Sequence, residues 1–218
     1  MAIAQDATSS GTTTGTSLTI AHTVTGANTL LVVAGLTDNA TNDVVSGITY
    51  NGNAMTRVNT RAGARGGFRM YMYYILIGTA DGNSHNIVVS TSTSCYIRFY
   101  GASYTGAKQS AQPDAQATSG TSGAQAGPLS NTLTTVADNS LHLAYVVPDD
   151  HAVSIVSAIQ VVGLSGEYLF SSDPALVTPA GSNSVTTTWT STQGCDTVGA
   201  SFAPFVATTS GKNFLAFM

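Results

Sequence analysis

Two stretches of the chain read alike: GNSHNIVVSTSTSCYIRFYGASY at residues 82–104 and GSNSVTTTWTSTQGCDTVGASF at residues 181–202. Each begins with turn-forming residues, continues with alternating polar and apolar side chains, and ends in Gly-Ala-Ser and an aromatic residue. This alternation is typical of half-buried β-strands, so each copy predicts a strand, a tight connection and a second strand. Because a lone hairpin cannot bury its apolar face, the repeat predicts two related halves that close one sandwich.

A second match in the same order supports the duplication. The strands expected over residues 129–136 and 140–147 follow the pattern of those expected over residues 18–24 and 29–36. The turn within each pair reads ADNSL in one place and GANTL in the other. Repetition in a fixed order is the signature of an internal repeat. We therefore expect an all-β protein, a single antiparallel β-sandwich with little helix.

Three segments between the repeats make further predictions. The most aromatic strand is expected over residues 68–77, and both of its faces are largely apolar, so it should be central or meet a partner with one face. Asn51-Gly52 favours a tight hairpin turn. Residues 106–127 contain no large apolar side chain, and we interpret them as a crossover between the halves.

The length of 218 residues suits one all-β domain. We expect that domain over residues 17–206. Residues 1–16 are rich in Ser, Thr and Gly and lack periodicity, which predicts an extended N-terminal arm that is ordered only when a neighbour holds it. Residues 207–218 are expected to form a C-terminal tail.

Charge is scarce in this chain. Charged residues make up 8% of the sequence, against about 25% in typical soluble proteins. Few like charges usually lower solubility, so an assembly that covers much of the surface is expected. The net charge of −4 argues against general nucleic-acid binding. The N-terminus lacks a signal-peptide pattern, and the apolar run Leu30–Leu36 is too short to span a membrane, so synthesis and folding in a cytoplasm are expected.

The two cysteines, Cys95 and Cys195, stand at matching places in the repeat. Two interpretations are open: a disulfide between the halves, or two small buried thiols.

No catalytic motif is present, since the sequence has no G-x-S-x-G, P-loop, C-x-x-C or H-E-x-x-H pattern and only one glutamate, Glu167. We expect no enzyme, no cofactor and no metal site. The polar loop 38–43 offers Ca²⁺ ligands but not the EF-hand spacing, and Asx-rich turns are common. Asp149-Asp150-His151 offers an acid/base or metal cluster, although adjacent loop residues seldom converge. The strand histidines are expected to be structural.

Four of the seven cationic residues are Arg57, Arg61, Arg65 and Arg69. Their spacing is helical, but the glycines around residues 63–67 favour a hairpin instead. The functional hypothesis is contact with an anion or acidic partner; the alternative is a solvated hairpin that resists edge aggregation. On either reading Arg61 and Arg65 should lie near the tip, more exposed than Arg98.

Aromatic side chains offer a second hypothesis for binding. They either stack on sugar rings or fill the sandwich and a subunit interface. The candidates are Tyr71, Tyr73, Tyr96, Tyr100 and Trp189.

Several short segments in order resemble a known group of modules. They are TYNGNAMT at 49–56, YY at 73–74, GT at 78–79, HNIVV at 85–89, ASYTG at 102–106 and QPDA at 112–115. Together, over roughly residues 17–205, they resemble jelly-roll-like β-sandwich modules of phage virion proteins and large bacterial surface proteins. These are turn and core residues, so the resemblance is informative for the fold and implies no catalytic residue.

The resemblance implies a structural virion protein. A single module with its own initiator Met favours a capsid decoration or cement protein that stabilises the head shell. We expect such a protein to be a homo-oligomer, specifically a trimer, and to bind the major capsid protein or another virion protein. The alternative is a receptor- or glycan-binding module of a tail or fibre. Neither nucleic acid nor membrane is an expected partner. The tail carries Phe214, Leu215, Phe217 and Met218, and we expect it to dock on a neighbouring subunit or the virion surface rather than fold back on its own domain.

Overall fold

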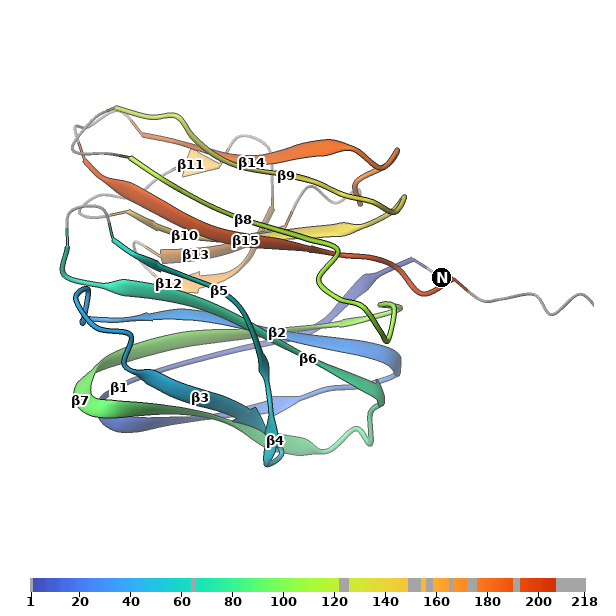
Figure 1. The fold of residues 1–218 in the computed structure, drawn as a ribbon. Coiled ribbons are helices and arrows are strands. Elements are labelled where there is room, and N and C mark those ends of the chain that lie inside the picture. The colour runs from blue at the N-terminus through green and yellow to red at the C-terminus, as the bar shows by residue number, and fades with distance from the viewer. Residues whose placement is uncertain are drawn as a thin grey trace, which may run out of the picture.

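The computed structural model describes residues 2–63, 66–121, 126–148, 154–155, 159–164, 167–171, 176–189 and 193–206. Among these residues the fold is all-β, with no helix (Figure 1). The strands are β1 (Ala4–Thr23), β2 (Ala27–Thr37), β3 (Val45–Tyr50), β4 (Asn53–Ala54), β5 (Thr56–Ala62), β6 (Arg69–Thr79), β7 (Ser84–Thr105), β8 (Ala115–Gly120), β9 (Leu129–Thr134), β10 (Leu141–Pro148), β11 (Ser154–Ile155), β12 (Ile159–Leu164), β13 (Glu167–Ser171), β14 (Ser182–Thr188) and β15 (Cys195–Phe202).

The main antiparallel sheet has the order β4-β3-β7-β2-β6-β5, with β1 also paired to β7, and it is nearly closed into a barrel. Its organising strand is β7, which is 22 residues long. The first part of β7 pairs with β3 and the second part with β2, while β1 follows it along nearly its whole length. The prediction of a hairpin over residues 82–104 is therefore wrong, because residues 84–104 of this copy belong to one continuous strand that changes its partner from β3 to β2.

Two smaller sheets follow, with orders β12-β13-β10-β15-β8 and β11-β14-β9. Their pairing order matches that of the main sheet: β10 lies between β13 and β15 as β2 lies between β6 and β7. The second copy of the repeat divides into β14 and β15, which belong to different sheets. Leu30 pairs with Tyr104 and Leu141 pairs with Phe202, so the Gly-Ala-Ser-aromatic segments occupy corresponding places.

The same correspondence separates the two cysteines. Because Leu141 takes the place of Leu30, Pro148 takes the place of Thr37. Cys195 pairs with Pro148, whereas Ile97 pairs with Thr37. Cys195 thus corresponds to Ile97 and not to Cys95, and the expected match is wrong by two residues. Both cysteines are buried and free.

Two strands lie where the sequence predicted none. Residues 4–15 are not an arm held by a neighbour but the first part of β1, paired with residues 95–105 of the same chain. Residues 115–120, within the expected crossover, form β8 and pair with β15. Both segments are poor in large apolar side chains, and their backbone hydrogen bonds cover an edge that would otherwise be unpaired.

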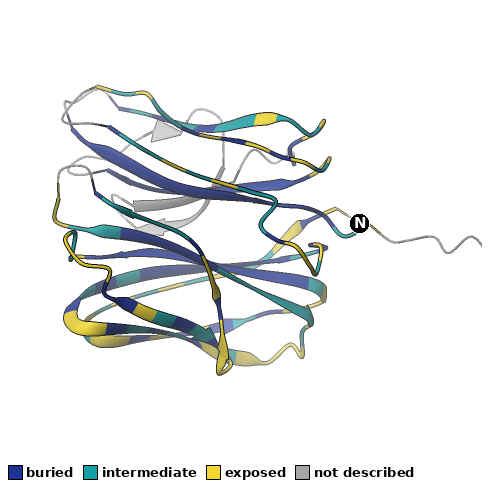
Figure 2. Cartoon of the chain, in the orientation of Figure 1, coloured by how far each residue is buried: buried dark blue, intermediate teal, exposed yellow. Residues whose placement is uncertain are grey.

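Among the described residues the buried hydrophobic side chains form three clusters rather than the single core of one sandwich. Figure 2 shows how the buried positions are distributed along the strands. One lies inside the curled main sheet, and a small one, which includes Trp189, lies between the two smaller sheets. The third is shared by β2, β6 and β7 on one side and β10 and β15 on the other. At its centre the rings of Tyr100 and Tyr145 are 5.9 Å apart. Around this shared core β1 lies near β12, and β5 lies near β8.

Strand β6 confirms the prediction made from its two apolar faces. It lies between β2 and β5. Met70 and Met72 enter the shared core, whereas Tyr71 and Tyr73 enter the core of the main sheet. The partner that covers its second face is the other part of the same chain.

Candidate functional site

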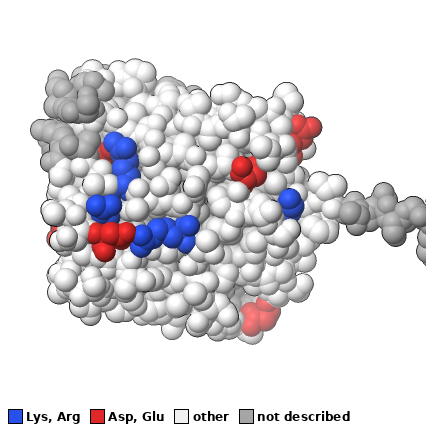
Figure 3. All heavy atoms as spheres, viewed as in Figure 1, with Lys and Arg blue, Asp and Glu red and all other residues white. Residues whose placement is uncertain are grey.

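Three of the four arginines in the run, Arg57, Arg61 and Arg69, lie on β5 and β6, and Figure 3 shows basic side chains gathered at one side of the face that it draws. Arg57 is engaged within the chain: its guanidinium donates to Asp43 Oδ2 at 2.5 Å, to Tyr73 Oη at 2.7 Å and to Val45 O at 2.9 Å. Arg69 donates to Ala40 O at 3.2 Å. Arg65 lies outside the described residues.

Arg61 crosses between the sheets. Its Nε donates to Asp196 Oδ1 at 2.5 Å, and the Asp196 side chain is fully buried. Arg61 stands at the end of β5, as expected for a residue near the tip, but its exposure is intermediate, like that of Arg98. The structure therefore uses Arg57 and Arg61 for internal ion pairs, which leaves less charge for an external anion.

The polar loop before β3 is also used internally. Asp38 Oδ1 accepts from Tyr96 N at 2.7 Å, and Asn39 Oδ1 accepts from Asn42 N at 3.0 Å. Within the described residues no three His, Cys, Asp or Glu side chains gather as metal ligands. The cluster Asp149-Asp150-His151 lies outside those residues.

Most of the aromatic candidates for sugar stacking are unavailable. Tyr71, Tyr73, Tyr100 and Trp189 are buried. Tyr96 is half-exposed, and its hydroxyl accepts from Arg98 Nη2. The first four fill cores, so a stacking platform built from them is ruled out by their burial.

The buried histidine of β10 lies in a polar network inside the smaller sheets. His142 Nδ1 lies 2.7 Å from Asn183 Oδ1, and His142 Nε2 lies 3.1 Å from Asn131 Oδ1. Asn131 in turn donates to Thr197 Oγ1 at 2.7 Å. Burial lowers the pKa of His142 to about 4. This arrangement is structural, in line with the interpretation of the strand histidines.

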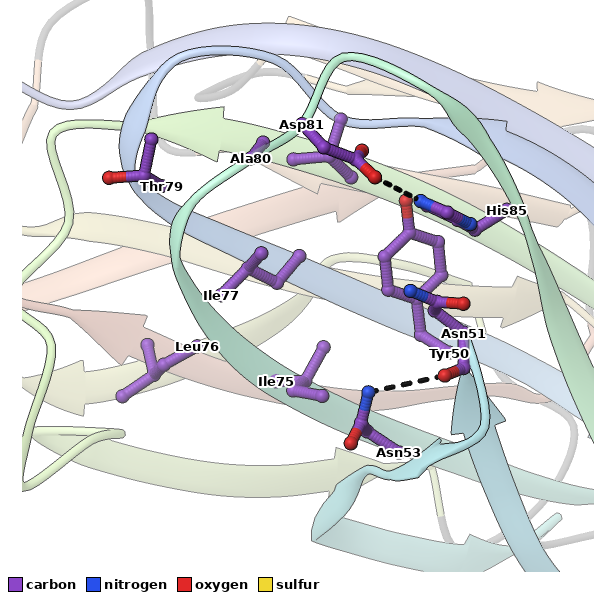
Figure 4. Close-up of a pocket in the computed structure, with 11 residues that line it drawn as sticks. Tyr50, Asn51, Asn53, Ile75, Leu76, Ile77, Thr79, Ala80, Asp81 and His85 are labelled. Atoms are coloured by element: carbon purple, nitrogen blue, oxygen red, sulfur yellow. Dashed lines mark hydrogen bonds and ion pairs between the residues drawn. The ribbon is translucent and has the colours of Figure 1, made fainter.

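A pocket of about 420 Å³ opens at one end of the main-sheet core (Figure 4). The tight turn at Asn51-Gly52 forms one wall; both residues have positive φ, as the predicted hairpin turn requires. The end of β6 and the β6–β7 turn form the others. The lining residues are Val24, Tyr50, Asn51, Asn53, Ile75, Leu76, Ile77, Thr79, Ala80, Asp81 and His85. We refer to it as the Asp81 pocket.

The rim of the Asp81 pocket is polar. Asp81 Oδ1 accepts from Asn83 N at 3.0 Å, and Oδ2 accepts from His85 Nε2 at 2.9 Å. These bonds, the backbone N–H of Asn83 first, lower the pKa of the Asp81 carboxyl to about 2. The carboxylate is therefore ionised at neutral pH. Figure 4 shows Asp81, His85 and the Tyr50 hydroxyl on the same side of the pocket.

The inner part of the Asp81 pocket is apolar. Val24 is buried, and Ile75, Ile77 and Ala80 pack at the edge of the main-sheet core. The Tyr50 ring meets the His85 ring edge-on at 5.8 Å, and its hydroxyl donates to His22 O at 3.2 Å. Sequence reasoning missed this site because its walls come from segments far apart in the chain. The only local signals were a turn containing Asp81 and a strand histidine.

A second hollow, of about 820 Å³, lies at the end of the shared core where the described chain ends. Two of its lining residues, Val136 and Val206, are each 74% exposed, and no other large hydrophobic side chain of the described residues is comparably exposed. We refer to this hollow as the Val136 groove. The expected docking residues Phe214, Leu215, Phe217 and Met218 lie outside the described residues. The groove is lined by residues 108–111, 113–114, 136–137 and 203–206.

Comparison with known proteins identifies no relative: no family model, curated protein or solved structure matches the chain. Within the ranges that the structure describes, no helix is long and apolar enough to cross a membrane.

Proposed function

We propose that the protein is a structural component of a phage virion, and specifically a decoration or cement protein that binds and stabilises the capsid shell. The observation that carries the proposal is the Val136 groove on a protein with very few charges. Charged residues make up only 8% of the sequence, and the groove leaves the side chains of Val136 and Val206 in water. Such a surface is typical of an interaction site.

We propose further that the chain is a tandem duplication of a jelly-roll-like unit. The matching pairing order of β2 and β10 supports this, as do the left-handed Asn28 and Asn139, which occupy corresponding turns with φ of 53° and 60°. The shared core would then be the surface on which two early copies of the unit met.

The occupant proposed for the Val136 groove is the apolar C-terminus of a neighbouring copy in a trimer. Seven residues, Ala207–Asn213, separate the groove from Phe214. An extended chain of that length reaches about 24 Å, which is enough to leave one subunit and contact the next. Burying each large apolar side chain of the tail contributes about 1.5–3 kcal/mol.

Copy number on the particle tests the proposed role. Quantitative mass spectrometry and cryo-electron microscopy of the particle of origin should find hundreds of copies on the head. Light scattering of the purified protein should give a trimer, and removal of residues 211–218 should reduce assembly while leaving the melting temperature unchanged. A deletion that lowers the melting temperature and leaves assembly intact would contradict the proposed docking.

A second candidate function is recognition of a receptor or glycan at a tail or fibre. The Asp81 pocket, whose size is within the range of small-ligand sites, favours a receptor over a glycan, because Tyr50 is buried and offers a sugar ring no exposed aromatic face. A handful of copies at the tail would select this candidate over decoration.

A further inference from the structure

We infer that the Asp81 pocket is a binding site for a lysine side chain of a partner protein. The inference rests on one feature: an ionised carboxylate at the polar rim of a cavity whose walls include the aliphatic side chains of Ile75 and Ile77. It does not depend on the proposed virion role, because it follows from the lining of the pocket alone.

The charge of the lining favours a cation. Asp81 is its only carboxylate, and neither Lys nor Arg is among its lining residues. The Asp81 side chain is 53% exposed, so an incoming ammonium group can reach it. Each of its oxygens accepts one hydrogen bond, from Asn83 or from His85, and keeps a lone pair for a further donor.

The walls of the pocket match an aliphatic stem. Ile75 and Ile77 project from the end of β6 toward the cavity, as Figure 4 shows, and Val24 adds a buried branched side chain. A lysine places four methylenes along apolar surface while its ammonium stays at the polar rim. The pocket thus places apolar side chains where the methylenes of a lysine would lie and a carboxylate where its ammonium group would lie.

Two other ligand classes fit less well. Arginine binds carboxylates best through two parallel hydrogen bonds, but both Asp81 oxygens are already partly engaged, which favours the compact point charge of an ammonium group. A sugar ring binds best on an exposed aromatic face. The Tyr50 ring is 4% exposed and is met edge-on by His85, so it offers no such face.

The test is a titration of the full chain followed by amide chemical shifts in nuclear magnetic resonance. The probe is Nα-acetyl-lysine N-methylamide. The matched probes are the norleucine analogue, which keeps the stem without the charge, the arginine analogue, and methyl glucoside. The lysine probe should give saturable shifts at residues 50–53 and 75–85, with a dissociation constant of about 1–10 mM. The norleucine analogue and the glucoside should give none at those concentrations, and the arginine analogue should bind more weakly.

Two variants and a control locate the site. Asp81→Asn should weaken lysine binding at least about tenfold, because it removes the charge while an amide oxygen still accepts from Asn83 N. Asn53→Arg should weaken it similarly, since Asn53 is exposed and the new cation stands at the rim. Asp138→Asn, an equal loss of charge in the turn before β10, should leave binding unchanged. The inference is overturned by equal binding of norleucine, by preferential binding of arginine or glucoside, by the absence of saturable shifts, or by an equal effect of Asp138→Asn.

Discussion

Arg61 Nε and Asp196 Oδ1 lie 2.5 Å apart, and this ion pair joins β5 of the main sheet to β15 of the five-stranded sheet. Asp196 is fully buried, whereas the Arg61 side chain is 27% exposed. The pair closes one side of the shared core. A buried carboxylate depends on its partner, because an uncompensated charge in a protein interior is strongly destabilising.

Removing the cation should therefore be costly. Arg61→Ala is expected to lower the free energy of unfolding by about 3 kcal/mol, because it removes the guanidinium that bonds the buried Asp196 carboxylate. The matched control is Asp43→Ala, which removes only the exposed carboxylate partner of Arg57 and keeps the bonds of Arg57 to Tyr73 and Val45, and there the loss should be about 1 kcal/mol. Urea denaturation of both variants measures the difference. Equal losses would show that the Arg61 pair is no more important than a surface pair.

A glycine beside this pair should not tolerate a side chain. A Cβ added at Gly120 would lie 1.9 Å from Asp196 Oδ1 and 2.2 Å from Arg61 Nη2. Gly120→Ala should therefore separate the ion pair or displace β8, and lower the melting temperature by several degrees. Gly47→Ala is the control, because nothing lies within 4 Å of its added Cβ. Calorimetry that finds the two variants alike would contradict the close approach of β8.

One substitution should stabilise the protein. Tyr104 is buried in the shared core, and among the described residues its hydroxyl has no hydrogen-bond partner. Phe202 stands at the corresponding place in the second part of the chain. Tyr104→Phe should raise the free energy of unfolding by about 1 kcal/mol, because it removes an unsatisfied buried polar group. Tyr50→Phe should lower it by about the same amount, since that hydroxyl donates to His22 O. Chemical denaturation that shows a loss for Tyr104→Phe would mean that its hydroxyl is satisfied.

Stability should fall as the pH drops below neutrality, through His142. Burial lowers the pKa of His142 from 6.5 to about 4. Between these pH values His142 is therefore protonated in the unfolded chain and neutral in the folded protein. Stability from this source is complete above pH 6.5 and declines toward pH 4, by about 3 kcal/mol in all. The measurement is the free energy of unfolding at pH 7.5, 6 and 5 for the protein and for His142→Gln. The same slope in both would exclude His142 as the cause.

Alternation and turn chemistry were enough to predict much of the fold. The apolar faces of β6, the turn at Asn51-Gly52 and the corresponding places of Tyr104 and Phe202 all follow from side chains that face a core or from backbone that needs positive φ. The structural role of such residues follows from their side-chain hydrophobicity or backbone preference, so it can be predicted from a single sequence.

The parts that could not be predicted depend on long-range partners. The first part of β1 and all of β8 are held by backbone hydrogen bonds to β7 and β15. These segments consist largely of Thr, Ser, Gly and other small residues, which show no hydrophobic pattern from which a paired strand could be predicted. The hairpin error has the same origin, because only the partner strands β3 and β2 show that β7 continues without a turn. The Asp81 pocket is assembled from the ends of strands distant in sequence, and nothing local to Asp81 or His85 indicates the aliphatic wall at Ile75 and Ile77.

The main sheet and the five-stranded sheet meet with β1 near β12 and β5 near β8. The two parts of the chain therefore contact each other through corresponding faces, as two subunits do across a two-fold axis. In a dimer of identical subunits, two-fold symmetry places each side chain of the interface at two equivalent positions, so a substitution changes both positions together. Within one chain this restriction is lifted. The main sheet pairs Ala34 with Tyr100, and the five-stranded sheet puts the large residue on the other strand, pairing Tyr145 with Val198. The rings of Tyr100 and Tyr145 therefore come from strands that do not correspond to each other, and they pack side by side. A dimer of identical subunits could not place a large residue on one strand in one subunit and on another strand in its partner.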